Sequence, residues 1–242
     1  MGGSIPLGPG LRYKGALDPL VTFDAGQTFI DLDVELLARR LEERGVRATP
    51  DQLAAATPAA WRRYDELVDG SHGHPWHELM ATLLAGAGVS QPGLVEWLWS
   101  EQPRKNLWRR PIDDMVALAR ELAAAGAVIA VLSNSEGTLA ALLEEIGLAA
   151  PFAAIIDSGA VGIHKPDRRI FEHALARTGR TTGIHIGDSW SADIEGALGA
   201  GWRAVWYGRR AAPVDDPRVA VARSAAEVRE ALARWGVPIR AR

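Results

Sequence analysis

The fold is decided by the stretch LVTFDAGQTF, residues 20–29 of a 242-residue chain. A short apolar run is followed by one carboxylate, Asp24, and then by the small residues Ala25 and Gly26. An apolar run of this length that ends in a polar residue is typical of a buried β-strand. Because ligands of parallel α/β sheets bind beyond the carboxyl ends of the strands, Asp24 is a candidate functional residue.

The composition is that of an ordinary globular protein, with 48% hydrophobic and 24% charged residues. A formal net charge of −3 argues against a nucleic-acid-binding surface, and the absence of Cys excludes disulfides and thiolate chemistry. The longest apolar stretch, LAAAGAVIAVL, is too short to cross a bilayer. We therefore expect no membrane partner and a cytoplasmic location. Residues 1–16 are rich in Gly and Pro, lack a signal-peptide pattern and are expected to form a disordered leader.

Periodicity divides the chain into two kinds of segment. Residues 33–108 have helical spacing throughout, and Thr49-Pro50 and Thr57-Pro58 each resemble the start of a helix. After residue 108, helical patterns alternate with short apolar strands, which predicts a parallel sheet with helices on both faces. We expect a three-layer α/β/α Rossmann-like core of residues 17–32 and 109–242. An all-α helical bundle of residues 33–108 is inserted into it as a cap.

Four segments, each next to a predicted strand, resemble those of the haloacid dehalogenase-like hydrolase superfamily. They are FDAGQT (23–28), VLSNS (131–135), GIHKPD (162–167) and IGDSWSAD (186–193). The helical block after the first segment is similar to the cap domain inserted there in one branch of the family. Single motifs of this kind are weak, but four in the same order predict the fold strongly.

The resemblance implies phosphoryl transfer with a magnesium ion. Asp24 would be the nucleophile that forms an aspartyl phosphate. The metal ligands would be Asp24, the main-chain carbonyl of Gly26 and Asp188, with Asp193 holding a metal-bound water or Lys165. A main-chain ligand leaves this set intact even though residue 26 is Gly.

The remaining family positions would bind the transferring phosphate. Lys165 would contact a phosphate oxygen and Asp24, and Ser133 and the Asn134 amide would donate to the same group. The chain has only three Lys among 27 basic residues, so a Lys at this position favours a functional role. Alternative interpretations remain: Lys165 as a solvated loop charge, Asp24 as a turn residue, and Ser133 as a cap for a helix beginning near Glu136.

Gly26 departs from the family pattern, because phosphatases carry there an Asp that protonates the leaving oxygen. Either the leaving group needs no proton, or a cap side chain supplies one, or the reaction is not phosphoryl transfer. The cap offers His72, His74 and His77, and of these His74, in a loop before Pro75, is the candidate phosphate-binding or acidic residue.

The sequence thus predicts a Mg²⁺-dependent phosphatase-like hydrolase of a small phosphorylated metabolite, acting as a monomer or homodimer. One alternative is an L-2-haloacid-dehalogenase-like hydrolase, since those enzymes also lack the second Asp. The other is a noncatalytic module that binds phosphorylated ligands or a protein partner. Asp31 falls where relatives carry an Asp at the hinge into the cap, and we expect it to orient that linker.

Overall fold

Six short apolar strands form one parallel sheet at the centre of the computed structural model, which describes residues 18–68, 75–208 and 212–239. Their order across the sheet is β5-β4-β1-β6-β7-β8. Their bounds are β1 Leu20–Phe23, β4 Ile129–Ser133, β5 Ala154–Asp157, β6 Gly183–Gly187, β7 Arg203–Tyr207 and β8 Val219–Ala222. The expected leader, residues 1–16, lies outside the described residues.

Side-chain alternation along the strands builds two separate cores, one on each face of the sheet. In β1, Val21 and Phe23 pack into one core, and Leu20 belongs to the other. The first face is covered by α5, Asp113–Ala124, α6, Leu139–Glu145, and α10, Ala225–Arg234. The second is covered by α8, Arg168–Thr178, the π-helix η1, Trp190–Glu195, and α9, Gly196–Gly199. This confirms the predicted three-layer α/β/α core.

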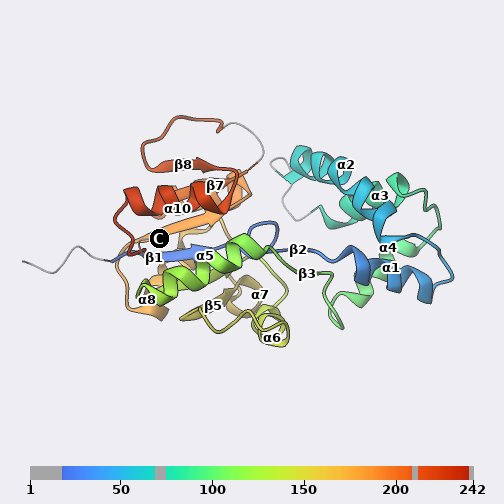
Figure 1. Ribbon diagram of the computed structural model, residues 1–242, viewed down its shortest axis with the longest axis horizontal. Coiled ribbons are helices and arrows are strands. Elements are labelled where there is room, and N and C mark those ends of the chain that lie inside the picture. Colours follow the sequence, from blue (N-terminus) through green and yellow to red (C-terminus); the bar gives the residue numbers. More distant parts are fainter. Residues whose placement is uncertain (1–17, 69–74, 209–211, 240–242) are drawn as a thin grey trace, which may run out of the picture.

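The inserted segment is helical, as predicted, and lies beside the core (Figure 1). Its helices are α1 Val34–Glu43, α2 Pro50–Val68, α3 Trp76–Gly86 and α4 Leu94–Glu101. Buried apolar side chains from these four helices form its interior, such as Leu37, Trp61, Met80 and Leu98. None of the helices in the described ranges combines the length and apolar composition needed to cross a lipid bilayer.

Two short antiparallel strands connect the helical segment to the core. They are β2, Ile30–Leu32, and β3, Trp108–Pro111. The sequence pattern had not predicted either strand. Asp31 pairs with Arg110 in the register of these strands, and their side chains form an ion pair of 2.7 Å. Asp31 therefore ties the two linkers together, which is the role expected of it.

The prediction of two helices, starting at Thr49 and at Thr57, was half wrong. Thr49 and Gln52 do form a capping box, with Thr49 Oγ1 accepting from the Gln52 N–H at 3.2 Å. The helix then continues through Pro58, and the Thr57 hydroxyl donates back to the Leu53 carbonyl at 2.9 Å. Pro58 deprives one carbonyl of its partner, but buried contacts of the same helix offset that local cost.

Candidate active site

The order in which the chain adds strands to the sheet reverses at the centre of the sheet, between β1 and β6. From β1 the chain proceeds to β4 and β5 on one side and then returns to β6 on the other side of β1. Clefts at such switch points lie beyond the carboxyl ends of the two central strands. Asp24 directly follows β1, and Asp188 directly follows β6. The topology thus brings together two residues that are far apart in the sequence.

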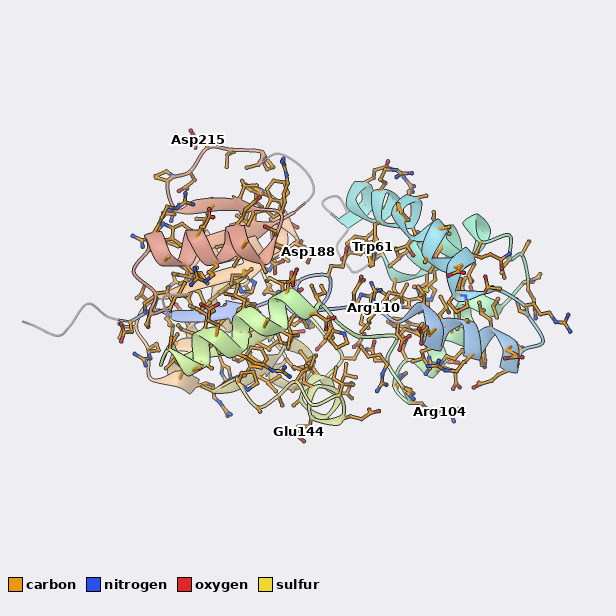
Figure 2. The ribbon with its side chains drawn as sticks, viewed as in Figure 1. Trp61, Arg104, Arg110, Glu144, Asp188 and Asp215 are labelled. Atoms are coloured by element: carbon orange, nitrogen blue, oxygen red, sulfur yellow. The ribbon has the colours of Figure 1, made fainter. Side chains whose placement is uncertain are left out.

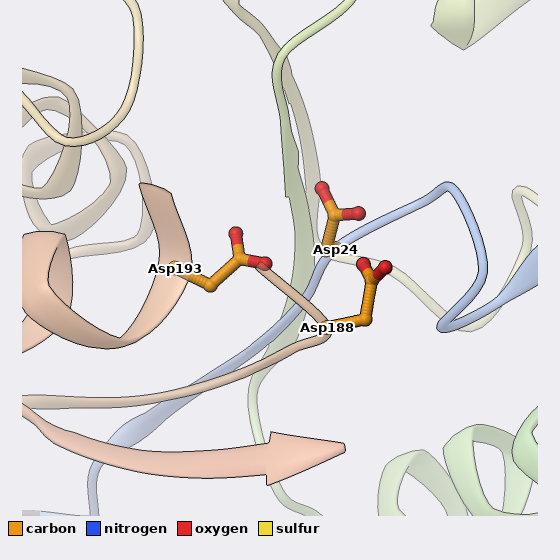
Figure 3. Close-up of side chains that lie close together, drawn as sticks. All are labelled: Asp24, Asp188 and Asp193. Atoms are coloured by element: carbon orange, nitrogen blue, oxygen red, sulfur yellow. The ribbon is translucent and has the colours of Figure 1, made fainter. Parts of the chain in front are cut away.

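Three carboxylates converge at this point. Asp24, Asp188 and Asp193 each offer an oxygen, and these atoms lie within 4.8 Å of one another. Figure 3 shows the three side chains approaching one another from the end of β1, the loop after β6 and η1. Asp24 is 9% exposed and Asp193 only 1%. Such close, poorly solvated carboxylates repel one another unless a cation lies among them.

Lys165 supplies one of the required positive charges. Its Nζ donates to Asp24 Oδ1 at 2.7 Å and to Asp193 Oδ1 at 2.5 Å, and its side chain is almost fully buried. The loop that carries Lys165 is held by Asn134, whose amide accepts from the Lys165 N–H at 2.8 Å and donates to the Lys165 carbonyl at 3.0 Å. The Asn134 side chain therefore fixes the backbone position of this lysine.

Asp193 is held by the backbone of the preceding loop as well as by side chains. Its Oδ2 accepts from the Ser189 N–H at 2.8 Å, at the start of η1. Gly187 leaves room for this carboxylate, because a Cβ at residue 187 would lie 2.3 Å from Asp193 Cγ. Any other residue there would displace Asp193, so the glycine before Asp188 is required by packing.

Two buried side chains, Thr22 and His185, lie beneath the carboxylates, and the motifs did not indicate them. His185 Nε2 is 3.0 Å from Asp193 Oδ1, and His185 Nδ1 is 2.7 Å from Thr22 Oγ1. Thr22 and His185 are register partners on β1 and β6, and both are completely buried. The only signal in the sequence is a polar residue inside each of two apolar strands, and it does not say that the two residues pair.

The hydrogen bonds determine the tautomer of His185. Lys165 and His185 hold the pKa of Asp193 below its usual range against the effect of burial, so Asp193 is ionised and only accepts. Burial and the nearby Lys165 lower the pKa of His185, which is therefore neutral. Its proton lies on Nε2 toward Asp193, and the Thr22 hydroxyl donates to Nδ1.

The charges of the cluster fit a divalent cation. Burial raises the pKa of Asp188 well above its ordinary value, and the Asp24 and Asp193 carboxylates raise it further. Burial also raises the pKa of Asp24, although Lys165 opposes this shift. With all three carboxylates ionised, Lys165 leaves two negative charges uncompensated. Hard oxygen donors with this charge are what Mg²⁺ prefers, so the residues present fit the metal.

The other predicted site residues lie in different surroundings. Ser133 is the last residue of β4, is 4% exposed and faces Asp157 in the strand register. The helix after it is α6, whose first N–H, that of Leu139, donates to Asp157 at 2.9 Å. Capping of that helix therefore comes from Asp157, not from Ser133. His74 lies outside the described residues, and His77 is an exposed residue in the first turn of α3.

Gly26 faces an aromatic side chain of the linker. A Cβ built at residue 26 would lie 3.6 Å from Trp108 Cδ1 and 3.8 Å from Trp108 Nε1, which is ordinary contact. The neighbouring Gln27 has a φ of 56°, in the left-handed region that non-glycine residues rarely adopt. The loop after Asp24 thus has space for a side chain at residue 26, although the sequence places none there.

Comparison with known proteins agrees with this geometry. Residues 83–201 match the family model described as haloacid dehalogenase-like hydrolase. The chain is 30% identical over 199 residues to haloacid dehalogenase-like hydrolase domain-containing protein 3 of Bos taurus, covering 75% of this chain and 78% of that protein. It is 29% identical over 230 residues to a phosphoserine phosphatase of Thermus thermophilus, covering 81% and 91%.

A solved structure shows the same fold. It is that of the magnesium-bound hydrolase YfnB of Bacillus subtilis, with a TM-score of 0.63, 24% identity and coverage of 88% of this chain and 98% of that one. The six-stranded parallel sheet, the helical insertion after β1 and the sequence matches lead to one conclusion. The chain belongs to the haloacid dehalogenase-like hydrolases.

Proposed function

We propose that this protein is a Mg²⁺-dependent phosphatase that acts on small phosphate esters or anhydrides with good leaving groups. The observation that supports it most directly is the buried Asp24–Lys165–Asp193 hydrogen-bonded set beside Asp188, at the switch point of the sheet. The similarity to a protein named phosphoserine phosphatase and to a magnesium-bound hydrolase supports the same reaction class. The roles given to individual residues below are part of this proposal.

Asp24 is the nucleophile. One of its oxygens attacks phosphorus, the bond from phosphorus to the leaving oxygen breaks, and the leaving group departs with the electron pair. Water then attacks the aspartyl phosphate, which releases inorganic phosphate and regenerates Asp24. Lys165 orients the Asp24 carboxylate through its 2.7 Å hydrogen bond and balances negative charge on the phosphate.

Asp24, Asp188 and the Gly26 carbonyl would hold the metal ion. When bound, Mg²⁺ supplies charge compensation that allows a carboxylate to approach an anionic phosphate. Asp193 is engaged by Lys165, His185 and Ser189 and acts by positioning Lys165 or a metal-bound water. Ser133 donates to the phosphate. Asn134, expected from the sequence to be a second donor to the phosphate, has its side-chain amide engaged by the Lys165 backbone, and we assign it the positioning of that loop instead.

Gly26 sets the selectivity for leaving groups. A positioned general acid contributes roughly 10²–10⁴-fold, or about 3–5 kcal/mol of the barrier. Without an acid at residue 26, alkyl phosphates lose most of this amount, whereas aryl and acyl phosphates lose little because their leaving groups are stable as anions. His74 remains a proposed cap contact to phosphate, because it precedes Pro75 in an expected loop and histidine can act as an acid near neutral pH.

The test is a panel of acyl, aryl and alkyl phosphates measured with Mg²⁺ and with a chelator, using Asp24→Asn as the inactive control. We expect turnover that requires Mg²⁺ and that falls steeply from acyl and aryl to alkyl substrates. Equal rates for all leaving groups would exclude the role given to Gly26. No turnover on any substrate would favour a noncatalytic module that binds phosphorylated ligands.

One observation favours a second candidate, a haloacid dehalogenase: no acid stands at residue 26 in the loop after the nucleophile. In that reaction Asp24 would displace halide at carbon, and a metal would not be needed. The measurement that separates the two is halide release from L-2-haloacids in the presence of a chelator. Halide release without phosphatase activity would replace the phosphatase proposal.

A further inference from the structure

A cleft of about 610 Å³ opens beside the carboxylate cluster, and Asp188 is part of its wall. The remaining walls come from the loop after β1, the linkers and the ends of the last core strands, and they include Gln27, Arg110, Tyr207 and Arg223. In the described parts of the chain, none of the lining residues belongs to α1–α4. The described walls of the cleft therefore belong to the core and the linkers.

Among the described residues that line the cleft, Arg223 is the cationic side chain that no neighbour neutralises. Arg110 is held by Asp31 at 2.7 Å, so its charge is largely compensated. Arg223 lines the same cleft, and within the described ranges its guanidinium takes part in no ion pair. Its backbone N–H donates to Glu227 at 2.8 Å, and the Glu227 N–H donates to Ser224, the N-cap of α10, at 3.3 Å. The start of α10 therefore fixes the position of Arg223 after β8.

The rest of the described cleft wall offers one accessible aromatic side chain. Tyr207, at the end of β7, is half-buried, whereas the adjacent Trp206 is packed into the core and only 2% exposed. Pro111 and Ile112 lie on the linker side. Figure 2 shows Arg110 on the linker between core and cap, and Asp188 at the edge of the core nearby. Tyr207, Pro111 and Ile112 provide apolar contact among the charged groups of the cleft, and its volume lies within the range typical of small-molecule sites.

We propose that this cleft binds the leaving portion of the substrate and that Arg223 recognises a second anionic group on it. The substrate class is then an aryl or other planar phosphate that carries a carboxylate or a second phosphate. This inference rests on the proposed function, because the phosphate to be transferred lies at Asp24. Arg223 selects the substrate through charge, and Tyr207 contacts its planar body.

The experiment measures binding separately from turnover. Para-carboxyphenylphosphonate and para-carbamoylphenylphosphonate are non-hydrolysable, have the same shape and differ by one negative charge. Their affinities are measured calorimetrically with Mg²⁺ for the parent protein, Arg223→Gln, Arg223→Lys and Arg177→Gln. Arg177 is the matched control, because it is an exposed arginine in the last turn of α8, at the opposite edge of the sheet.

We expect the carboxylate to bind about three- to tenfold more tightly than the carboxamide, in the range of one partly exposed charge-assisted contact. Arg223→Gln should remove this preference, whereas Arg223→Lys and Arg177→Gln should keep it. Equal affinities in the parent protein, or an unchanged preference in Arg223→Gln, would overturn the proposal.

Turnover of the two matching aryl phosphates separates this inference from the proposed function. A binding preference that depends on Arg223 but is accompanied by no turnover rejects the phosphatase and supports the anion site. Turnover of both esters without a preference for the carboxylate rejects the anion site and supports the phosphatase. A meta-carboxyl ester and an ester with a second phosphate in place of the carboxylate show which anionic group fits best.

Discussion

Replacing Thr22 by Val tests whether the buried Thr22–His185 pair positions Lys165. Valine keeps the shape of threonine and removes the hydroxyl that lies 2.7 Å from His185 Nδ1. Both residues are completely buried, so water cannot replace the lost donor. An unsatisfied buried acceptor costs about 1–3 kcal/mol. A cost near 2 kcal/mol lowers the Tm of a protein of this size by about 4–8 °C.

The effect on activity follows from the chain of contacts. Thr22 donates to His185 Nδ1, His185 donates to Asp193, and Asp193 accepts from Lys165, which contacts Asp24. Without the Thr22 hydroxyl, His185 Nδ1 is a buried acceptor that has lost its donor, and the ring is held less firmly against Asp193. Loss of a hydrogen-bond partner that positions the reacting groups without touching them typically lowers activity about 10–100-fold. We expect kcat to fall about tenfold.

The assay combines kcat with imidazole ¹⁵N spectra of protein labelled at histidine. The chain has six His, and His185 is completely buried, with a pKa lowered by burial and by the nearby Lys165. The parent should show Nε2 protonated and Nδ1 unprotonated across the neutral pH range. Thr22→Ser is the control, because it loses a methyl group and some stability but keeps the donor. If Thr22→Val keeps the parent spectrum and rate, or if Thr22→Ser loses as much activity as Thr22→Val, the reasoning is wrong.

Three further predictions concern the carboxylates and Gly26. The fold accommodates Gly26→Asp, because the new Cβ would lie 3.6 Å from Trp108, an ordinary contact distance. This variant should raise alkyl phosphate turnover by up to about 10²-fold relative to aryl phosphate turnover. An unchanged ratio of the two steady-state rates would contradict the prediction. Asp24→Asn should abolish turnover and ³²P labelling of the protein while keeping the circular dichroism spectrum, and any residual phosphoprotein would point to another nucleophile. Asp188→Asn should raise the Tm of the metal-free protein at neutral pH and remove the Tm increase caused by Mg²⁺. The sign of this change follows from the raised pKa of Asp188. The metal-free parent is most stable below the ordinary Asp pKa and loses stability as the pH rises through the folded-state pKa. A lower Tm of Asp188→Asn than of the parent would contradict this prediction.

Much of the architecture is encoded locally. Apolar runs of strand length, alternating with amphipathic helical patterns, predicted the parallel core, and helical spacing over the insertion predicted the cap. The same local signals failed at Thr57, where a Thr-Pro pair resembles a helix start but lies inside α2. There the packing of the helix outweighs the local preference of proline. The linker strands β2 and β3 are too short to show a pattern, and they exist because they pair with each other.

The candidate site also combines local and long-range information. The sequence by itself showed that most of its charged residues follow predicted strands; these residues are Asp24, Lys165, Asp188 and Asp193. Only the tertiary structure decided that Thr22 and His185, 163 positions apart, pair beneath them, and that Arg223 shares a cleft with Asp188. Hydrophobic periodicity and helix caps act over a few residues, whereas strand order and register depend on contacts across the whole chain. The sequence therefore indicated the charged residues of the candidate site, but it did not indicate which residues contact them.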